Sequence, residues 1–589
     1  KMEKEISDDI EYLRKNWSKV NQNRNANIFD SEERRAEIAA ANEARTELRH
    51  HKDEFFEEIA ERLQTALQEL SSRLSEEEGY ENALFSEDAT RGFAFIELCQ
   101  KRFDCIVMNP PFGEGSEHTS QYLDDNYSAW CDNLVCSFFI RMQEMLCSDG
   151  LLGAIFDRTV FVRSSYKKYR ISCLVGKIVC CADTGWGVLD ANVETSCLVT
   201  SRNATITNSK FVDIRDCDSE RKEIELKTVI DSVNGGVVNK NYFECNSNDL
   251  VYYPNTTVCY DSTKLSIFKH TTIEVRGFSV KTGYCFVAPI HQRLFFELCH
   301  SKYFKGLYNG SEYTLFYKAY RDVVFWGIDG SIDKAHISYR GGNDSVQQKK
   351  GIAYGKRGDI VDAHILKQGN FFTSEGLAIP DLSNEESYVA LSLLNSIYTQ
   401  YTINLFCGQH KRSGYMNLLP MPDYATRQSD IECIVNAIID IKRKWFSLDE
   451  TNLEYHGLIA QMHIDTTIDA ALDKMQEQLT ADYARYEELV KENDDLWMDL
   501  ADINRNSEFR QTLNNYKSRR PYEELLSIDG VSNQNVIDKK VMSQEIVMEL
   551  VGMVFGRWNT AYAKGEQAIP EFGDVFDALP FMPVVSQGK

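Results

Sequence analysis

The chain has 589 residues, of which 43% are hydrophobic and 11% aromatic, and its formal net charge is −24. This length allows roughly three or four domains, and the apolar content supports large cores, which excludes a disordered tail. The acidic excess argues against a simple nucleic-acid binder, because phosphate affinity comes from clustered Lys and Arg. The sequence has no apolar run long enough to cross a bilayer and no signal-peptide pattern, so we expect a cytoplasmic protein without a membrane partner.

The sixteen cysteines are scattered along the chain. Cys180 and Cys181 are adjacent, and the Cys131/Cys136 pair has no second pair nearby at the spacing of a zinc site. In a chain of this size we interpret the cysteines as reduced thiols of the core. We therefore expect no metal site.

Residues 1–88 form a charged region rich in Glu, Arg, Ala and Leu, with no Gly before Gly79. Apolar residues recur there at spacings of three and four, which predicts a long amphipathic helix or helical hairpin that ends near Gly79. The positions that carry this pattern are Ile59, Leu63, Ala66, Leu67, Leu70 and Leu74.

Residues 89–205 alternate strand-like and helix-like segments, which predicts a parallel α/β sheet. In such sheets the active groups lie at the carboxyl ends of the strands. The predicted strands are residues 103–108, 151–156, 177–182 and 196–200, the predicted helices are residues 133–147 and 166–174, and residues 148–150 are predicted to form a turn.

Asn109-Pro110-Pro111-Phe112 follows the first of these strands directly. The tetrapeptide resembles motif IV of the amino-methyltransferases that methylate the exocyclic nitrogen of adenine in DNA. Protein-glutamine and RNA methyltransferases share it, so the motif indicates a planar amide or amine acceptor. The alternative interpretation is an ordinary turn that closes a buried strand.

The resemblance implies a role for each residue of the motif. The Asn109 side-chain oxygen and the Pro110 carbonyl would accept hydrogen bonds from the amine and draw it towards a nucleophilic, pyramidal form. Pro110 and Pro111 fix φ and remove N–H donors, so that the turn presents carbonyl groups. Phe112 would stack on a base rotated out of the duplex.

Residues 206–426 contain short β-like runs, many aromatic residues and Gly-rich turns. Residues 276–370 carry 14 Lys and Arg against 8 Asp and Glu, a local net charge of +6 in a chain whose remainder carries −30. Such a basic region can form a nucleic-acid surface, although a charged face is often simply solvated. The candidate DNA-binding residues are Lys281, Arg340, Asn343, Gln347, Lys349, Lys350, Lys356, Arg357, Lys411 and Arg412.

Residues 427–589 are predicted to be a helical carboxyl-terminal domain. Between about residues 427 and 515 the sequence is helical and acidic, with Ile434, Ile438, Ile441 and Trp445 on one stripe. We expect these helices to pack or dock, since most charged helical faces are solvated.

Further segments, taken in order, resemble the large γ-type adenine DNA methyltransferases, which include type IIG enzymes. Segments near the carboxyl terminus resemble the BREX phage-defence methyltransferase (PglX type) and the related DISARM enzyme. The resemblance implies a partial Rossmann-like methyltransferase sheet, a β-rich target-recognition domain and a helical carboxyl-terminal domain. The segments that carry it are residues 151–155 with Phe161 and Tyr169-Arg170, 281–283 with 292–294, 376–380, 391–396, 418–422, Trp445 onwards, and 554–558.

The resemblance also implies S-adenosylmethionine as cofactor and double-stranded DNA as partner, with other phage-defence subunits as further partners. Enzymes of this type carry a Gly-rich cofactor loop upstream of motif IV, and residues 1–88 show none. We therefore expect an upstream cofactor-binding half or a second chain that supplies it. Two alternatives stay open: a DNA-binding or specificity component that is inactive without such a partner, and an amide or RNA methyltransferase.

Overall fold

The computed structural model of the protein describes most of residues 101–231, 348–462, 467–501 and 535–578. It also describes short pieces between residues 236 and 340 and between 513 and 526, and single positions upstream of residue 101. The helix predicted for residues 1–88 lies outside the described residues, apart from a few positions that are helical. The chain divides into two compact units, residues 1–106 with 141–150 and residues 107–140 with 151–589.

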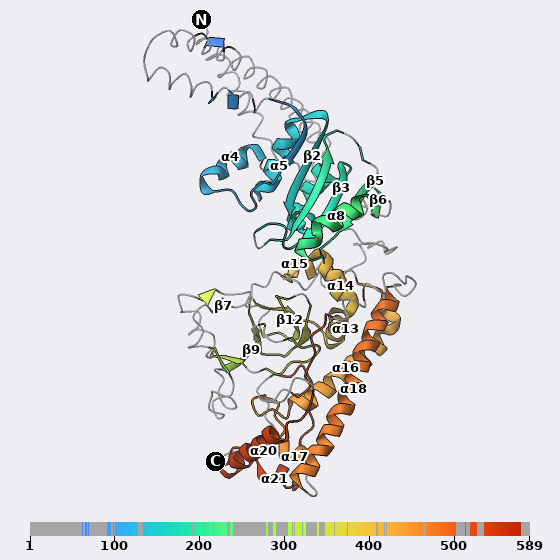
Figure 1. The fold of residues 1–589 in the computed structure, drawn as a ribbon. Coiled ribbons are helices and arrows are strands. Elements are labelled where there is room, and N and C mark those ends of the chain that lie inside the picture. Colours follow the sequence, from blue (N-terminus) through green and yellow to red (C-terminus); the bar gives the residue numbers. More distant parts are fainter. Residues whose placement is uncertain are drawn as a thin grey trace, which may run out of the picture. The chain divides into compact units, whose positions relative to one another are not determined.

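A six-stranded sheet follows the charged amino-terminal region (Figure 1). Its strand order is β1-β2-β4-β3-β5-β6. The strands are β1 (Phe103–Met108), β2 (Leu146–Asp157), β3 (Ile178–Gly185), β4 (Thr195–Ser201), β5 (Asn208–Asp213) and β6 (Gly236–Asn239). The helices of this region include α4 (Glu117–Tyr127), α5 (Leu134–Glu144), α6 (Thr159–Val162), α7 (Lys167–Tyr169) and α8 (Lys222–Asp231).

The sheet is mixed, so the prediction of a parallel sheet for residues 89–205 is wrong for β4, and β5 and β6 extend the sheet beyond residue 205. β4 pairs antiparallel with both β2 and β3, and β6 pairs antiparallel with β5, whereas β3 and β5 are parallel. The short connection from β3 to β4, residues 186–194, explains the direction of β4. A parallel neighbour would need a crossover of about a dozen residues or more.

The predicted elements around α5 and β4 are largely confirmed, with one correction at the start of β2. β2 begins at Leu146, so the turn predicted for residues 148–150 is part of a strand. A Cβ on Gly150 would lie 3.0 Å from the carbonyl oxygen of Phe103. This glycine therefore permits a close approach of two backbones and does not form a turn. The helix predicted for residues 166–174 consists of short pieces, a 3-10 turn at Ser164–Tyr166, α7, and a π-helical turn at Arg170–Leu174.

β1 and β2 start side by side, because the N–H of Phe103 donates to the carbonyl oxygen of Met145 at 2.9 Å. The two strands are neighbours in the sheet and are connected through α4 and α5, as parallel neighbours require. The chain that leaves β1 therefore lies at the same edge of the sheet as the chain that leaves β2. We call this the carboxyl edge.

Short strands occupy the described part of residues 279–380, as expected. β9 and β10 are the inner strands of a four-stranded sheet, and β12 is the central strand of a three-stranded sheet. The strands are β7 (Ser279–Val280), β8 (Val287–Pro289), β9 (Phe304–Tyr308), β10 (Asp322–Phe325), β11 (Tyr339–Arg340), β12 (Gly351–Gly355), β13 (Ala363–Leu366), β14 (Phe371–Phe372) and β15 (Gly376–Pro380).

Two helices follow these strands where the sequence analysis expected none, α13 (Asn384–Leu394) and α14 (Ile397–Phe406). α13 begins with a capping box: the Ser383 hydroxyl accepts from the N–H of Glu386, and the Glu386 carboxylate accepts from the N–H of Ser383. Both residue types and their spacing are visible in the sequence. This start signal could therefore have identified the helix.

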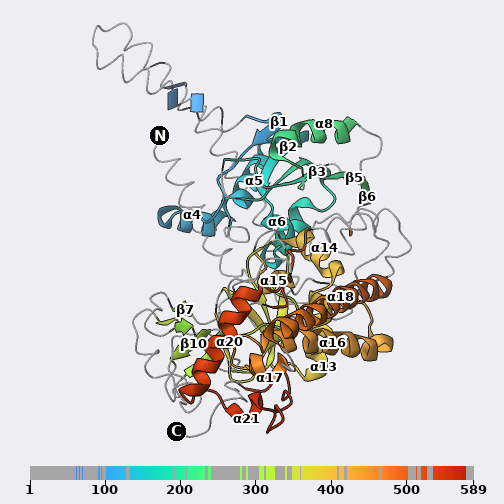
Figure 2. The ribbon, with the colours of Figure 1, turned by 60° about the horizontal axis from the view of Figure 1, so that its bottom comes forward.

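The described carboxyl-terminal residues form helices, and α16 (Gln428–Phe446) and α18 (Ile468–Leu500) lie side by side in both ribbon views (Figures 1 and 2). The predicted stripe on α16 is confirmed for Ile434, Ile438 and Trp445, which are buried, whereas Ile441 is only half-buried. The shorter helices are α15 (Ser413–Met416), α17 (Leu458–Met462), α20 (Lys539–Val554) and α21 (Thr560–Ala563).

Buried ion pairs join the β-rich part to these helices. The Lys442 ammonium of α16 is fully buried, bonds to the Thr314 hydroxyl at 2.7 Å and pairs with the Glu523 carboxylate. Lys367 lies 3.1 Å from the carboxylate of Glu454. Such groups tolerate burial only when they are paired, so the contacts fix how the two parts pack.

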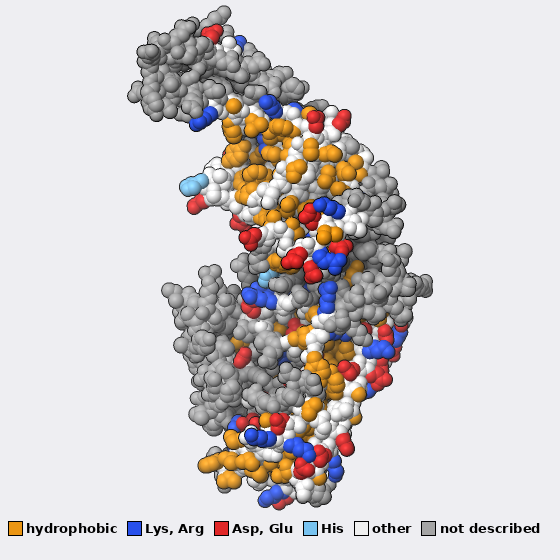
Figure 3. Space-filling view, in the orientation of Figure 1, with side chains coloured by type: hydrophobic (Ala, Val, Ile, Leu, Met, Phe, Trp, Pro, Cys, Tyr) orange, Lys and Arg blue, Asp and Glu red, His pale blue; other side chains and the backbone are white. Residues whose placement is uncertain are grey.

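α20 exposes apolar side chains along one side, which Figure 3 shows as a hydrophobic patch. The exposed residues are Val547, Met548, Leu550, Val551, Val554 and Phe555. Among the described residues, no helix combines the length and the apolar character needed to span a bilayer.

Candidate active site

The loop that carries Asn109–Phe112, which we call the motif loop, leaves β1 at the carboxyl edge of the sheet. Asn109 is exposed, Pro110 is buried and Phe112 is half-buried. Pro110 thus anchors the turn while the Asn109 amide stays accessible to a ligand. The partial exposure of Phe112 leaves ring surface on which a planar group can stack.

Asn133 holds the end of this loop, and the sequence analysis did not identify it. Its Oδ1 accepts hydrogen bonds from the N–H groups of Gly113 (3.3 Å) and Val135 (3.1 Å). The N–H of Leu134 in turn donates to the carbonyl oxygen of Gly113 at 2.8 Å. Asn133 is therefore the amino-terminal cap of α5 and the tether of the loop. An Asn before a predicted helix is a known capping signal and could have revealed it.

The other end of the Asn133 amide contacts Tyr166. Its Nδ2 lies 3.3 Å from the Tyr166 hydroxyl oxygen. Burial raises the pKa of Tyr166 above its ordinary value, so the hydroxyl is neutral at neutral pH. Asn133 thus has buried partners for both its acceptor and its donor, which fixes the orientation of its amide.

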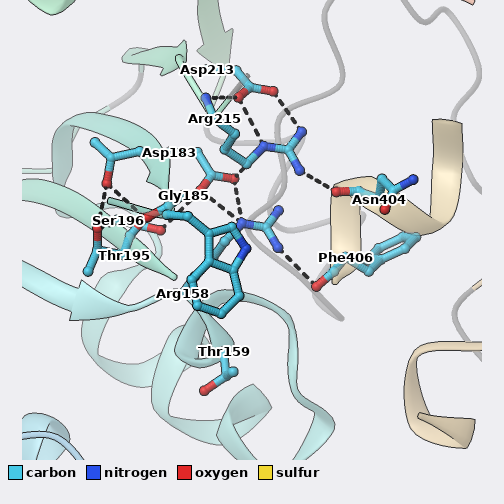
Figure 4. A network of polar contacts seen from close by, with 12 residues as sticks. Arg158, Thr159, Asp183, Gly185, Thr195, Ser196, Asp213, Arg215, Asn404 and Phe406 are labelled. Carbon is cyan, nitrogen blue, oxygen red and sulfur yellow. Dashed lines mark hydrogen bonds and ion pairs between the residues drawn. The ribbon is translucent and has the colours of Figure 1, made fainter. Parts of the chain in front are cut away.

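Charged side chains gather further along the carboxyl edge (Figure 4). Arg158 follows β2, and its Nε donates to the two carboxylate oxygens of Asp183 at 2.8 and 2.9 Å. The Arg215 guanidinium follows β5, bonds to Asp213 at 2.9 and 2.7 Å, and lies 3.4 Å from Asp183. Both aspartates are therefore engaged by arginine. No local sequence signal indicates this network, because its members come from three strands.

An α/β sheet commonly holds a nucleoside-containing cofactor with a Gly-rich turn that leaves open space and with an acidic residue that is free to bind the ribose. Gly185 and Gly187 follow β3, but side chains there would meet Arg215 and Ser219. The turn therefore packs against the chain itself, and Asp183 and Asp213 are already paired with arginine. The turn at the end of β3 therefore does not fit a cofactor-binding loop.

Two of the candidate DNA-binding cations share one carboxylate. Lys356 Nζ and Arg357 Nε each lie 2.8 Å from the Glu375 carboxylate. Burial alone would raise the pKa of Glu375, but the hydrogen bonds and charges of Lys356 and Arg357 hold it below its ordinary value. Any phosphate that binds here must therefore compete with Glu375.

The structure brings together two candidate segments that are far apart in the sequence. Arg357 and His410 form an isolated antiparallel bridge, and the N–H of Lys411 donates to the Lys356 carbonyl oxygen at 2.7 Å. Arg412 is exposed beside this bridge, whereas Lys411 is buried and its Nζ lies 3.0 Å from Asn404 Oδ1. Lys356, Arg357 and Arg412 thus belong to one local surface, which we call the basic surface.

The remaining candidates are separate from this surface or not described. Lys349 pairs with Asp381 at 3.3 Å, and Lys350 Nζ bonds to Asn384 Oδ1 at 2.6 Å. Arg340 lies on β11, with its backbone paired to β7. Lys281, Asn343 and Gln347 lie outside the described residues. No group of three potential metal ligands occurs among the residues that the structure describes.

Comparison with known families gives one match: residues 5–175 match the family of the Eco57I restriction-modification methylase. The matched segment runs from the charged region through Asn109–Phe112 and α5 to the end of the helical pieces after β2. This part of the chain is therefore similar to a methylase of the restriction-modification type. The comparison with curated proteins gives no match.

Several solved structures are similar to the chain. The type IIL restriction-modification enzyme MmeI in complex with DNA has 11% identity and a TM-score of 0.39, over 70% of this chain and 57% of that one. The type IIG restriction endonuclease BpuSI has 10% identity and a TM-score of 0.24, over 68% and 54%. A type I restriction-modification methyltransferase subunit from Streptococcus thermophilus has 16% identity and a TM-score of 0.21, over 26% and 37%. The chain thus spans little more than half the length of MmeI or BpuSI.

Proposed function

We propose that this chain is the base-handling and DNA-recognition portion of a site-specific DNA methyltransferase that transfers a methyl group from S-adenosylmethionine to adenine N6. One observation carries the proposal. Asn109–Phe112 leaves a strand at the carboxyl edge of an α/β sheet, inside a segment that matches a restriction-modification methylase. The biological role would be to mark self DNA in a restriction-modification or phage-defence system of the BREX, DISARM or type IIG kind.

The exocyclic amine of adenine is a weak nucleophile, because its lone pair is delocalised into the ring. The exposed Asn109 amide and the Pro110 carbonyl would accept hydrogen bonds from this amine and localise the lone pair. Phe112 would hold the extruded base by stacking, and Pro111 keeps the turn rigid. Asn133 maintains the loop through Gly113, so that the acceptors meet the amine in a fixed geometry.

The basic surface and the other candidate cations would hold the DNA. Lys349, Lys350, Lys356, Arg357 and Arg412 would bind phosphates, and Arg340, Asn343 and Gln347 would read base edges. Lys281 and Lys411 complete the proposed DNA-binding set. Lys411 is buried, so its contribution would come through the segment that it supports.

The cofactor would be held elsewhere than in the described residues. An upstream half or a second chain would supply the Gly-rich loop and the acidic ribose ligand, and other phage-defence subunits would join the assembly. One observation favours a second candidate function, a DNA-binding or specificity component. The glycine pair at the end of β3, Gly185 and Gly187, packs against the chain itself.

The deciding experiment expresses the complete gene in a host whose DNA lacks adenine methylation and maps modified bases by single-molecule sequencing. We expect N6-methyladenine at one short sequence motif. DNA binding by the purified protein without methylation would favour the specificity component. Absence of both DNA binding and methylation would contradict both functions.

A further inference from the structure

Two arginines at the carboxyl edge reach the end of α14 (Figure 4). The Nη1 of Arg158 donates to the carbonyl oxygen of Phe406 at 3.0 Å, and the Nη1 of Arg215 donates to the carbonyl oxygen of Asn404. The last carbonyls of a helix lack donors within the helix, and they carry its partial negative charge. The two guanidinium groups therefore cap α14 from outside and bind it to the sheet.

The sheet holds both arginines rigidly. Both carboxylate oxygens of Asp183 accept hydrogen bonds from Arg158. Asp183 also forms an ion pair with Arg215, and Arg215 forms a second ion pair with Asp213. The Arg158 side chain is only 2% exposed. Charged hydrogen bonds of this kind are short and directional. They therefore fix the orientation of the two guanidinium groups on the sheet.

The same segment continues to the basic surface. Asn404 connects several groups. Its carbonyl oxygen accepts a hydrogen bond from Arg215, its Oδ1 accepts one from Lys411 at 3.0 Å, and its Nδ2 donates to the Gln400 carbonyl oxygen at 2.7 Å. Lys411 then donates through its backbone to Lys356. Residues 404–407 thus contact the methyltransferase sheet, and residues 410–412 contact the Lys356–Arg357 loop.

We propose that residues 404–407 and 410–412 form a joint that sets the position of the DNA-binding loop relative to the motif loop, and that Arg158 and Arg215 are positioning residues for methyl transfer. This inference rests on the proposed function. DNA held by Lys356 and Arg357 would present its target base to Asn109 only while the two arginines hold α14. Release of the joint would leave phosphate contacts intact and misplace the base.

Arg215→Gln is the informative variant, because the side chain is 13% exposed and its loss leaves Arg158 in place. The amide removes the charge and the reach to Asn404. Arg215→Lys keeps a cation at the helix end and is the conservative variant. Arg221→Gln is the matched control, since Arg221 lies just before α8 and forms only an exposed ion pair with Glu225.

The complete enzyme is tested on unmodified genomic DNA by three measurements: the single-turnover methylation rate, the Kd for DNA, and hydrogen exchange of the amides in residues 404–412. A misplacement of about 1 Å can cost a factor of up to roughly 100 in rate. For Arg215→Gln we expect the rate to fall between about 10- and 100-fold, the Kd to stay unchanged, and exchange in residues 404–412 to increase. Arg215→Lys should recover part of the rate, and Arg221→Gln should match the wild type in all three.

Three outcomes would overturn the inference. A wild-type rate in Arg215→Gln would show that the contact with α14 is not needed for methyl transfer. An equal loss of rate and DNA affinity, or a global rise in exchange, would show a structural role only. If the wild-type enzyme binds DNA but shows no methylation, the proposed function fails and the positioning role fails with it. Exchange in residues 404–412 would still report whether Arg215 holds the segment.

Discussion

Asn133 Oδ1 lies 3.3 Å from the backbone nitrogen of Gly113 and thereby ties the start of α5 to the loop that carries Asn109. A single amide caps the helix and restrains the motif. Gly113 has a φ of +102°, a backbone conformation that favours glycine. The loop therefore depends on two residues outside the Asn-Pro-Pro-Phe tetrapeptide.

Asn133→Ala should slow methylation by the complete enzyme, because Gly113 loses its tether. It should also lower stability by about 1 kcal/mol, the usual cost of a lost helix cap. Asn133→Asp keeps an acceptor for Gly113 and Val135 and should restore most of the rate. Single-turnover kinetics and thermal unfolding report the two effects separately.

Asn559→Ala is the matched control, because Asn559 caps α21 by accepting from the N–H of Ala561 at 3.0 Å. It should lower stability similarly without changing the rate. Equal rate losses in Asn133→Ala and Asn559→Ala would refute a specific role for Asn133.

Asn109→Ala should abolish adenine methylation and leave DNA binding largely intact, since the lost contact acts on the amine and not on phosphate. A restriction-protection assay measures the first effect and a salt-controlled binding titration the second. Full protection by this variant would exclude the role that we propose for Asn109.

Removal of the Glu375 charge should strengthen DNA binding at the basic surface. Because Glu375 neutralises Lys356 and Arg357, Glu375→Gln should tighten DNA binding at low salt. Lys356→Gln or Arg357→Gln should weaken binding to all sequences alike, and each should reduce the salt slope by roughly one unit. Base-reading residues such as Arg340 should instead relax preference at one position, by about 1–3 kcal/mol for a bidentate contact.

Simultaneous charge reversal at four of the five proposed phosphate contacts tests these cations together in one titration. Lys227→Glu, on the exposed face of α8, is the control with no expected effect. Unchanged affinity at low salt after reversal of the surface would leave these cations as ordinary solvated groups. The four positions to reverse are Lys349, Lys350, Lys356 and Arg357.

His364 should make the fold sensitive to acid. It is fully buried on β13, with its ring against Tyr308 at 4.5 Å between centroids. Burial, together with the charges of Lys318 and Lys442, holds the pKa of His364 well below its ordinary value of 6.5. The unfolded chain takes up a proton near pH 6.5 and the folded His364 does not, so the free energy of unfolding should fall by about 1.4 kcal/mol per pH unit below that point.

His364→Phe keeps an aromatic ring and removes the titrating group, so it should flatten this decline. Urea unfolding between pH 7 and 5 measures the slope. His410→Phe, at an exposed position, should keep the wild-type slope. An identical slope in His364→Phe and the wild type would show that other groups cause the acid sensitivity.

The chain of 589 residues should not bind S-adenosylmethionine appreciably by itself, because residues 1–88 show no Gly-rich loop and the glycine turn at the end of β3 is filled by the chain's own side chains. Isothermal calorimetry tests this directly. Micromolar binding would show that the amino-terminal region contributes a site that its sequence does not indicate.

Local patterns in the sequence sufficed where structure is determined by neighbours along the chain. The strand before Asn109 and the buried stripe Ile434, Ile438 and Trp445 follow from apolar periodicity. The start of β2 could not be predicted in this way. Ser148-Asp149-Gly150 has the composition of a turn, but Gly150 allows the close approach of its backbone to that of Phe103.

The candidate site shows the same division. Asn109–Phe112 is contiguous, so the sequence alone was enough to predict it as a site, and that role stays a prediction; Asn133 carried a usable capping signal. Arg158 had none, because its partner Phe406 lies 248 residues further along the chain and offers only a backbone carbonyl. Any residue can present that carbonyl, so the sequence of residues 404–406 does not record the contact.

The short end of α14 also limits how this protein can be re-engineered. Exchange of the recognition strands for those of another enzyme is a route to new sequence specificity, and the cut points decide whether the hybrid works. A graft that ends before residue 397 keeps α14 of this protein, and with it the terminal carbonyl groups that Arg158 and Arg215 contact. A graft that runs through residue 406 must bring a helix of the same length, since one residue more or less would rotate the terminal carbonyls by about 100° away from the arginines.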